Sequence, residues 1–213
     1  MKTKCNYRKD CSRGEDEADS TCKEYCYRHN TNWHSRGDGS IIYLDRQSGS
    51  CSSGYIMKSF YLERSGNNQR YVYTCCRFNN LSKIPSQKKY FTPERKIGSA
   101  HALKELHVKC KETGQFLTGF KNHGKWKKAK WTDFRKSFFM KTEYYCRKFD
   151  YPVSCKYGNS NSVSAGSQSQ YLYPLRADCS KINGDRSFMT EYQLKSQNNR
   201  FHYRLKCCKV VVQ

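Results

Sequence analysis

Short segments in which ring-bearing and polar positions alternate occur in both halves of the chain. In residues 71–74 and 201–206, aromatic rings or Leu alternate with polar residues or Val. A period of two places successive side chains on opposite faces and is typical of a β-strand. Residues 65–68 and 196–199, which precede these segments, are rich in Ser, Gly, Asn and Gln. Such residues favour tight turns, so the pattern predicts antiparallel hairpins.

A further strand is predicted upstream of the first turn. Its alternation predicts that Ile56, Lys58 and Phe60 lie on one face of the strand. Met57 and Ser59 are then expected on the opposite face.

An internal repeat organises these hairpins. Two units share one order of features: Cys, Gly, an apolar pair, an aromatic residue, an Asn pair with Arg, alternating aromatics and a final Cys-Cys. The first unit is predicted to span 26–77 and the last 155–209. A partial copy between them, 104–149, contains a basic insertion and closes on the single residue Cys146.

The expected fold is therefore all-β: disulfide-stapled antiparallel hairpin repeats joined by long irregular loops. Three hairpins can pack around a pseudo-threefold axis. We expect one compact domain over 26–213, preceded by a Cys-containing N-terminal segment, 1–25. The one helix candidate is the short segment 99–109.

The amino-acid composition indicates which interactions stabilise such a fold. The 213 residues include 31 aromatic residues and 13 Cys, but few Leu, Ile and Val. A low aliphatic content warns of disorder, whereas large rings and many Cys indicate a small, disulfide-stapled extracellular protein. Residues 1–5 lack the apolar core of a signal peptide. If the protein is secreted, we therefore expect that the numbering starts at a mature or recombinant end.

Equivalent Cys in the repeated units should form equivalent disulfides. This predicts five bonds: Cys51–Cys75, Cys179–Cys207, Cys110–Cys146, Cys26–Cys76 and Cys155–Cys208. Within each Cys-Cys pair the partners are interchangeable at this stage, because neighbours on a strand point to opposite faces. Cys5, Cys11 and Cys22 are left over, enough for one more bond and one unpaired thiol.

A metal site is the alternative interpretation of some of these Cys. Cys22, Cys26, His29 and His34 contain possible zinc ligands. Their spacing places the His residues too soon after the Cys pair for a zinc finger. Disulfides are therefore preferred, and a zinc-dependent nucleic-acid binder is the least favoured hypothesis.

The repeated units resemble the dermatopontin family. The resemblance lies in Cys-x-x-Gly segments that end in Arg, alternating aromatics and Cys-Cys, as in residues 70–76 and 200–208. The family's Asp before that Arg and its Trp-centred run are absent here. The resemblance implies a secreted, Tyr-rich matrix protein with three disulfide-bonded repeats. Family members include adhesion proteins that bind proteoglycan chains and integrins, agglutinins and a cytotoxin.

The net charge of +22 is concentrated most strongly in an insertion within the central unit, residues 121–136. Cations neutralise anionic groups, and flat rings stack on sugars or bases, so this segment is predicted to bind polyanions as a loop. The alternative is a solvated hairpin tip with its Trp residues tucked into the domain. The predicted binding residues are Lys121, Lys125, Trp126, Lys127, Lys128, Lys130, Trp131, Arg135 and Lys136.

Two shorter motifs suit an extracellular protein. Arg36, Gly37 and Asp38 form an Arg-Gly-Asp tripeptide in a Gly-rich stretch, where a carboxylate on a turn could complete an integrin's cation site. Asn80 begins a glycosylation sequon.

The sequence favours a binding protein over an enzyme. None of the six His lies in a nucleophile elbow, a metal-binding pair or a phosphate loop. We therefore predict no enzymatic activity, no cofactor and no metal. The first hypothesis is a secreted matrix or adhesion protein that binds an anionic polysaccharide such as a glycosaminoglycan, with attachment to an integrin-like receptor as a further option. The second is a secreted cytotoxin or agglutinin that acts at anionic cell surfaces.

Overall fold

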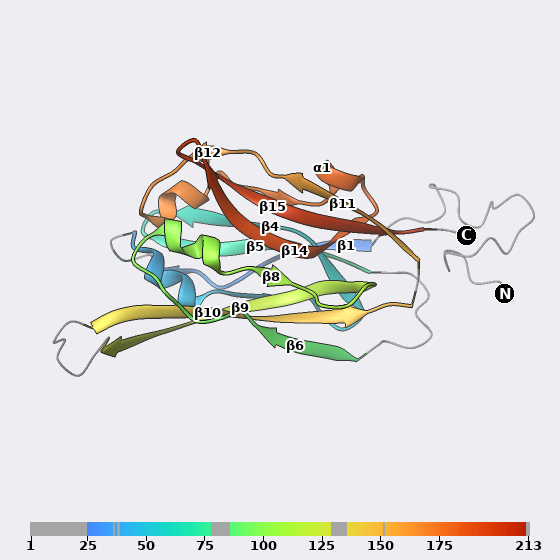
Figure 1. Ribbon diagram of the computed structural model, residues 1–213, viewed down its shortest axis with the longest axis horizontal. Coiled ribbons are helices and arrows are strands. Elements are labelled where there is room, and N and C mark those ends of the chain that lie inside the picture. The colour runs from blue at the N-terminus through green and yellow to red at the C-terminus, as the bar shows by residue number, and fades with distance from the viewer. Residues whose placement is uncertain are drawn as a thin grey trace, which may run out of the picture.

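The computed structural model describes residues 25–35, 37, 39–77, 86–128, 136–150 and 152–211. These residues form three antiparallel sheets of five strands each, which confirms the all-β prediction (Figure 1). Sheet A contains β1 (Tyr25–Asn30), β2 (His34–Ser35), β4 (Tyr55–Ser65), β5 (Asn68–Arg77) and β13 (Ala177–Asp178). Sheet B contains β3 (Ser48–Ser50), β6 (Gln87–Phe91), β7 (Arg95–Lys96), β9 (Gln115–Lys128) and β10 (Lys136–Lys148). Sheet C contains β8 (Val108–Lys109), β11 (Val153–Asn159), β12 (Val163–Ser164), β14 (Ser187–Gln197) and β15 (Arg200–Val210).

Helical structure in the described residues is confined to short turns. These are η2 (Ile41–Arg46), η3 (Ala100–Glu105), η4 (Ser169–Leu172) and α1 (Ser180–Asn183). The helix candidate over 99–109 is thus a 3-10 helix followed by β8. None of these described helices has the length and apolar character of a membrane span.

The three sheets share one strand order. Each is built on a hairpin, β4–β5, β9–β10 or β14–β15, whose second strand pairs with two earlier segments of the same unit. The short strand before each hairpin instead pairs with another sheet: β3 joins β9, β8 joins β14 and β13 joins β4. Backbone hydrogen bonds therefore connect all three sheets in a closed cycle. A pseudo-threefold axis stays a prediction. The two segments that pair with β10, β6 and β7, lie before residue 104, where the partial copy was predicted to start.

The hairpin turns form where the sequence predicts them. Residues 66–67 link β4 to β5, and residues 198–199 link β14 to β15. Asn198 and Asn199 have φ angles of 49° and 56°. Asn tolerates this left-handed region better than most residues, and two such residues in succession suit a tight hairpin turn.

A β-bulge overturns the predicted faces of the first hairpin. The register shifts between Met57 and Ser59, so Lys58 is an extra residue in β4. Ile56 and Met57 are both fully buried, and Phe60 packs in the same cluster as Met57 rather than with Ile56. The prediction that Ile56 shares a face with Phe60 was wrong because strict alternation fails at a bulge.

The larger core lies where the three sheets meet. Phe60 of sheet A has its ring centroid 5.3 Å from that of Phe120 in sheet B and 4.8 Å from that of Tyr192 in sheet C. Such tilted and edge contacts suit aromatic rings. Burial raises the pKa of Tyr71 and Tyr203 in this core far above the ordinary value, so both remain neutral. Rings thus replace the missing aliphatic residues.

Five disulfides reinforce the sheets: Cys26–Cys76, Cys51–Cys75, Cys110–Cys146, Cys155–Cys208 and Cys179–Cys207. These are the pairs that the alignment of the repeated units predicts. In the chain-entropy view, loops of this size each contribute about 3–4 kcal/mol. Disulfides in this number are typical of extracellular proteins. Cys5, Cys11 and Cys22 lie outside the described residues.

Candidate functional site

The strongest concentration of positive charge lies on the hairpin of sheet B. Residues 121–128 belong to β9 and pair in continuous register with β10. The prediction that the basic segment is a loop was therefore wrong for this part. Figure 1 shows the far ends of β9 and β10 extending beyond the other strands. Lys130, Trp131 and Arg135 lie outside the described residues.

Contacts beneath the hairpin fix its position on the domain. The amide of Asn122 donates to the carbonyl of Leu44 in η2 over 3.2 Å and accepts from the hydroxyl of Thr142 over 2.9 Å. Gly124 passes so close to β10 that a Cβ there would lie 2.1 Å from the Phe138 ring. Only Gly permits this approach. The close packing of β9 against β10 therefore supports the lysines that project from the opposite face of β9.

The strand geometry places Lys121, Lys125 and Lys127 on one face of the hairpin and Trp126, with Lys128 and Lys136, on the other. Trp126 pairs with Phe138 on the inner face, and their ring centroids lie 5.3 Å apart. The Trp126 side chain is nevertheless 56% exposed. Lys125 and Lys127 project from the opposite, outer face because side chains alternate along a strand. Lys128 and Lys136 are exposed and face each other across the hairpin end.

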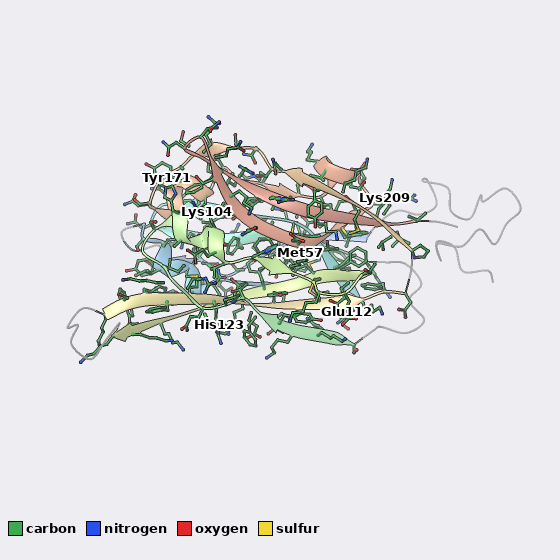
Figure 2. All side chains as sticks on the ribbon, viewed as in Figure 1. Met57, Lys104, Glu112, His123, Tyr171 and Lys209 are labelled. Carbon is green, nitrogen blue, oxygen red and sulfur yellow. A yellow bond between two sulfur atoms is a disulfide. The ribbon has the colours of Figure 1, made fainter. Side chains whose placement is uncertain are left out.

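Segments far away in the sequence complete the outer face. In the antiparallel register, Lys89 lies opposite Tyr145 and Phe91 opposite Glu143, while Lys96 of β7 lies opposite Phe139. Residues opposite each other in a pair share a face. We call this surface the basic face and define it by Lys89, Phe91, Lys96, Lys121, His123, Lys125, Lys127, Phe139, Lys141, Glu143 and Tyr145. Figure 2 labels His123 beside β9 and β10.

Aromatic rings lie among the ammonium groups of the basic face. The Lys141 nitrogen is 4.5 Å from the centroid of the Phe91 ring, and Lys89 approaches the same ring at 5.9 Å. Lys127 lies 5.2 Å from the Phe139 ring. Phe91 is 47% exposed. These rings orient the cations and add flat apolar surface beside them.

One carboxylate beside the face pairs with two of its cations. Glu94, in the turn before β7, accepts from Lys127 and lies 3.2 Å from Lys125. Its hydrogen bond with Lys127, aided by Lys125, holds the pKa of Glu94 below its ordinary value. Both lysines are therefore partly neutralised, although both reach solvent.

A second carboxylate is almost buried within the face. Glu143 accepts from the hydroxyl of Tyr145, lies 2.9 Å from His123 Nε2 and 3.5 Å from Lys89 Nζ. The Tyr145 hydroxyl contributes most to lowering the pKa of Glu143, and His123 and Lys89 act in the same direction. The carboxylate is thus kept charged and holds His123 in place.

The remaining lysines leave the face strongly cationic. Six ammonium groups and the two carboxylates of Glu94 and Glu143 give a local charge of +4 with His123 neutral. Among the described residues, no carboxylate lies within ion-pair distance of Lys96, Lys121 or Lys141. These three are available to an anionic partner without breaking an existing ion pair.

The other predicted sites are described only in part. Gly37 has a φ of 56°, which suits a turn, but Arg36 and Asp38 lie outside the described residues, as does Asn80. Of the alternative zinc ligands, Cys26 is bonded to Cys76, and the His29 ring stacks on Tyr73 at 5.5 Å. Within the described part of the chain, no group of three or more His, Cys, Asp or Glu is arranged to hold a metal.

Comparison with known proteins gives no relative. No family model, no curated protein and no solved structure matches the chain. The interpretation of the basic face therefore depends on its own geometry.

Proposed function

We propose that this chain is a secreted, non-enzymatic protein of the extracellular matrix or adhesion class that binds anionic polysaccharide through the basic face. The observation that carries the proposal is the row Lys121, Lys125 and Lys127 along one strand, flanked by Lys96 and Lys141. Side chains on one face repeat at about 7 Å along a strand, and His123 occupies the position between Lys121 and Lys125. A linear polymer with regularly spaced sulfate or carboxylate groups matches such a row.

The chemistry of the face supports a sugar polymer. Lys contributes a compact, strongly hydrated charge that pairs with dispersed anionic groups in the presence of water. The exposed ring of Phe91 offers a flat surface between Lys89 and Lys141, against which a sugar ring can stack. The disulfides favour an extracellular partner over nucleic acid. The resemblance to the dermatopontin family points to the same class of partner.

Heparin affinity of two matched variants tests the proposal. The triple substitution Lys96→Gln, Lys121→Gln and Lys141→Gln removes the cations that lack a carboxylate partner. We expect elution from a heparin column at clearly lower salt. We also expect the slope of log affinity against log salt to fall by about 2, because fewer counterions are displaced.

The matched control is Lys156→Gln, Lys195→Gln and Lys209→Gln, which removes the same charge from sheet C. Equal loss in both variants would show that net charge alone, and not the basic face, determines binding. A different result would contradict the proposal: the wild-type protein is not retained on heparin but releases dye from anionic vesicles. The basic face would then be assigned to cell membranes.

A further inference from the structure

A cavity of about 460 Å³ opens at the boundary between sheet A and the last unit. Its lining comes from β4, β13 and the residue before it, the end of β11 with the segment that follows, and α1. The polar and aromatic lining residues include Ser59, Tyr61, Asn159, Arg176, Asp178 and Lys181. Small-molecule sites have volumes of about 300–1,000 Å³ and combine apolar walls with a few polar groups. The cavity is therefore of the right size for a small ligand, and it lies outside sheet B.

The walls of this cavity are held in place by the fold. The Asn161 side chain donates to the carbonyl of Pro174 over 2.7 Å and accepts from the Arg176 backbone over 2.9 Å. On the other side, Asp178 Oδ1 accepts from the backbone and the hydroxyl of Ser180 at 3.0 and 2.7 Å. Disulfide Cys179–Cys207 anchors the adjoining chain to β15. A preformed site loses little entropy when a ligand binds.

One wall carries an ordered guanidinium. Arg176 lies over the Tyr61 ring with Cζ 3.7 Å from the centroid, and its Nη1 donates to the carbonyl of Tyr173 over 2.8 Å. Arg28 donates to the hydroxyl of the same Tyr61. The ring and the backbone thus fix Arg176, while Nε and Nη2 have no protein partner among the described residues.

Several further polar groups around the cavity have no hydrogen-bond partner within the described structure. In the described structure, Asp178 Oδ2, the Asn159 amide, the Ser59 hydroxyl and the Lys181 ammonium make no hydrogen bond or ion pair. The lining therefore offers both hydrogen-bond donors and acceptors to a ligand. The lining residues include two cations, Arg176 and Lys181, and a single carboxylate, Asp178. A ligand that satisfies this set must bring hydroxyl donors for the carboxylate and one negative charge for the cations.

We propose that this pocket, which we call the Tyr61 pocket, binds one acidic sugar residue in pyranose form. Ring hydroxyls donate to Asp178 and Asn159, and the acidic group pairs with Lys181 and Arg176. The Asp178 carboxylate repels ligands with several negative charges, which favours a singly charged sugar over a polyphosphate. The pocket belongs to sheets A and C, whereas the basic face belongs to sheet B, so this proposal stands independently of the proposed function.

Titration of the disulfide-bonded protein with two sugars, followed by NMR, tests the proposal. Methyl β-glucuronide is the probe, and methyl β-glucoside is its uncharged match. We expect the glucuronide to bind at least about tenfold more tightly, a difference of about 1.4 kcal/mol, because only it can form the charge-assisted contacts. Failure of both sugars to bind at concentrations well above about 10 mM would overturn the proposal.

Variants show whether binding occurs in the Tyr61 pocket. Lys181→Ala should lower glucuronide affinity with little effect on the glucoside. Asp178→Asn should weaken the binding of both sugars. The Oδ1 atom of the new Asn side chain can still accept the hydrogen bonds from Ser180. The control Lys209→Ala changes a lysine near the end of β15, labelled in Figure 2. Binding that survives Lys181→Ala and Asp178→Asn but is lost in the Lys96, Lys121 and Lys141 triple variant would overturn the proposal and leave only the basic face.

Discussion

Glu143 has two opposing roles in the basic face. Its carboxylate reduces the positive charge available to a polyanion, but it also orients His123 and bonds to Tyr145. Breaking this contact network by removing Glu143 leaves the partly exposed Tyr145 hydroxyl and His123 imidazole short of a partner. Glu143 therefore stabilises the fold but lowers the positive charge of the basic face.

The lowered pKa of Glu143 predicts a specific dependence of stability on pH. A carboxyl group whose pKa is lower in the folded than in the unfolded state, where it is about 4.3, stabilises the fold above that value. This contribution is lost as pH falls through the folded-state pKa. Glu143→Gln should therefore lower the free energy of unfolding at pH 7 and differ less from wild type at pH 3, as measured by urea unfolding.

The variant Glu105→Gln is the matched control because it removes an exposed carboxylate that pairs with Arg95. A Glu143→Gln variant whose deficit is unchanged between pH 7 and pH 3 would contradict this interpretation and indicate a packing effect.

At the level of single residues, the sequence revealed half of the lysines of the basic face: Lys121, Lys125 and Lys127. The run from Lys121 to Lys128 is visible as a cluster of charge in the sequence. Phe91, Lys96 and Lys141 were missed because they join the face through strand pairing between distant segments. Knowledge of the strands beside β10 would have identified Phe91 and Lys96, and knowledge of the β9–β10 register would have identified Lys141. Trp126 was grouped with the cations because a loop, unlike a strand, does not separate its neighbours.

The central hairpin lacks a disulfide that its two counterparts have. Cys26 pairs with Cys76 and Cys155 with Cys208 at opposed strand positions. In sheet B, the corresponding opposed residues are Gln87 and Arg147, and their side chains meet at 3.5 Å. Arg147 is nearly buried, and its Nε and Nη1 have no partner in the described part of the chain. Desolvation lowers its pKa.

Replacing this pair by Gln87→Cys and Arg147→Cys should create a sixth disulfide in the described structure. The bond would close a loop of 60 residues, similar to the existing separations of 50 and 53. We expect a gain of about 2–4 kcal/mol in the free energy of unfolding, since the unfolded chain is constrained and an unsatisfied buried cation is removed.

The comparison is with the double variant Gln87→Ser and Arg147→Ser, which makes the same change in size without the bond. Free thiols at both positions in the folded protein, found by mass spectrometry after alkylation, would show that the strands are not opposed as described.

Hairpins and disulfide pairs could be predicted because they depend on local turn residues and on equivalence between units. Three features of the elements could not be. The bulge at Lys58 breaks the alternation on which faces are assigned. The bridging strands β3, β8 and β13 have two or three residues each, too few to show any period. The strand pairing of residues 121–128 was missed because polar residues dominate that segment.

The molecule as a whole combines a rigid interior with a cationic exterior. The three hairpins meet through Phe60, Phe120 and Tyr192, and the bridging strands and disulfides prevent the sheets from separating independently. A rigid scaffold holds the lysines of the basic face in fixed register, so that the proposed binding of a polyanion would not have to order them. The excess of 40 basic over 18 acidic residues also attracts polyanions from a distance.

Chemical footprinting of the wild-type protein locates the binding surface without any substitution. Lysines are acetylated with and without a heparin octasaccharide, and the modified positions are quantified by mass spectrometry. If the basic face binds the polymer, Lys96, Lys121 and Lys141 will be protected several-fold while Lys156, Lys195 and Lys209 remain reactive. Protection spread evenly over both groups, or confined to sheet C, would contradict binding through the basic face.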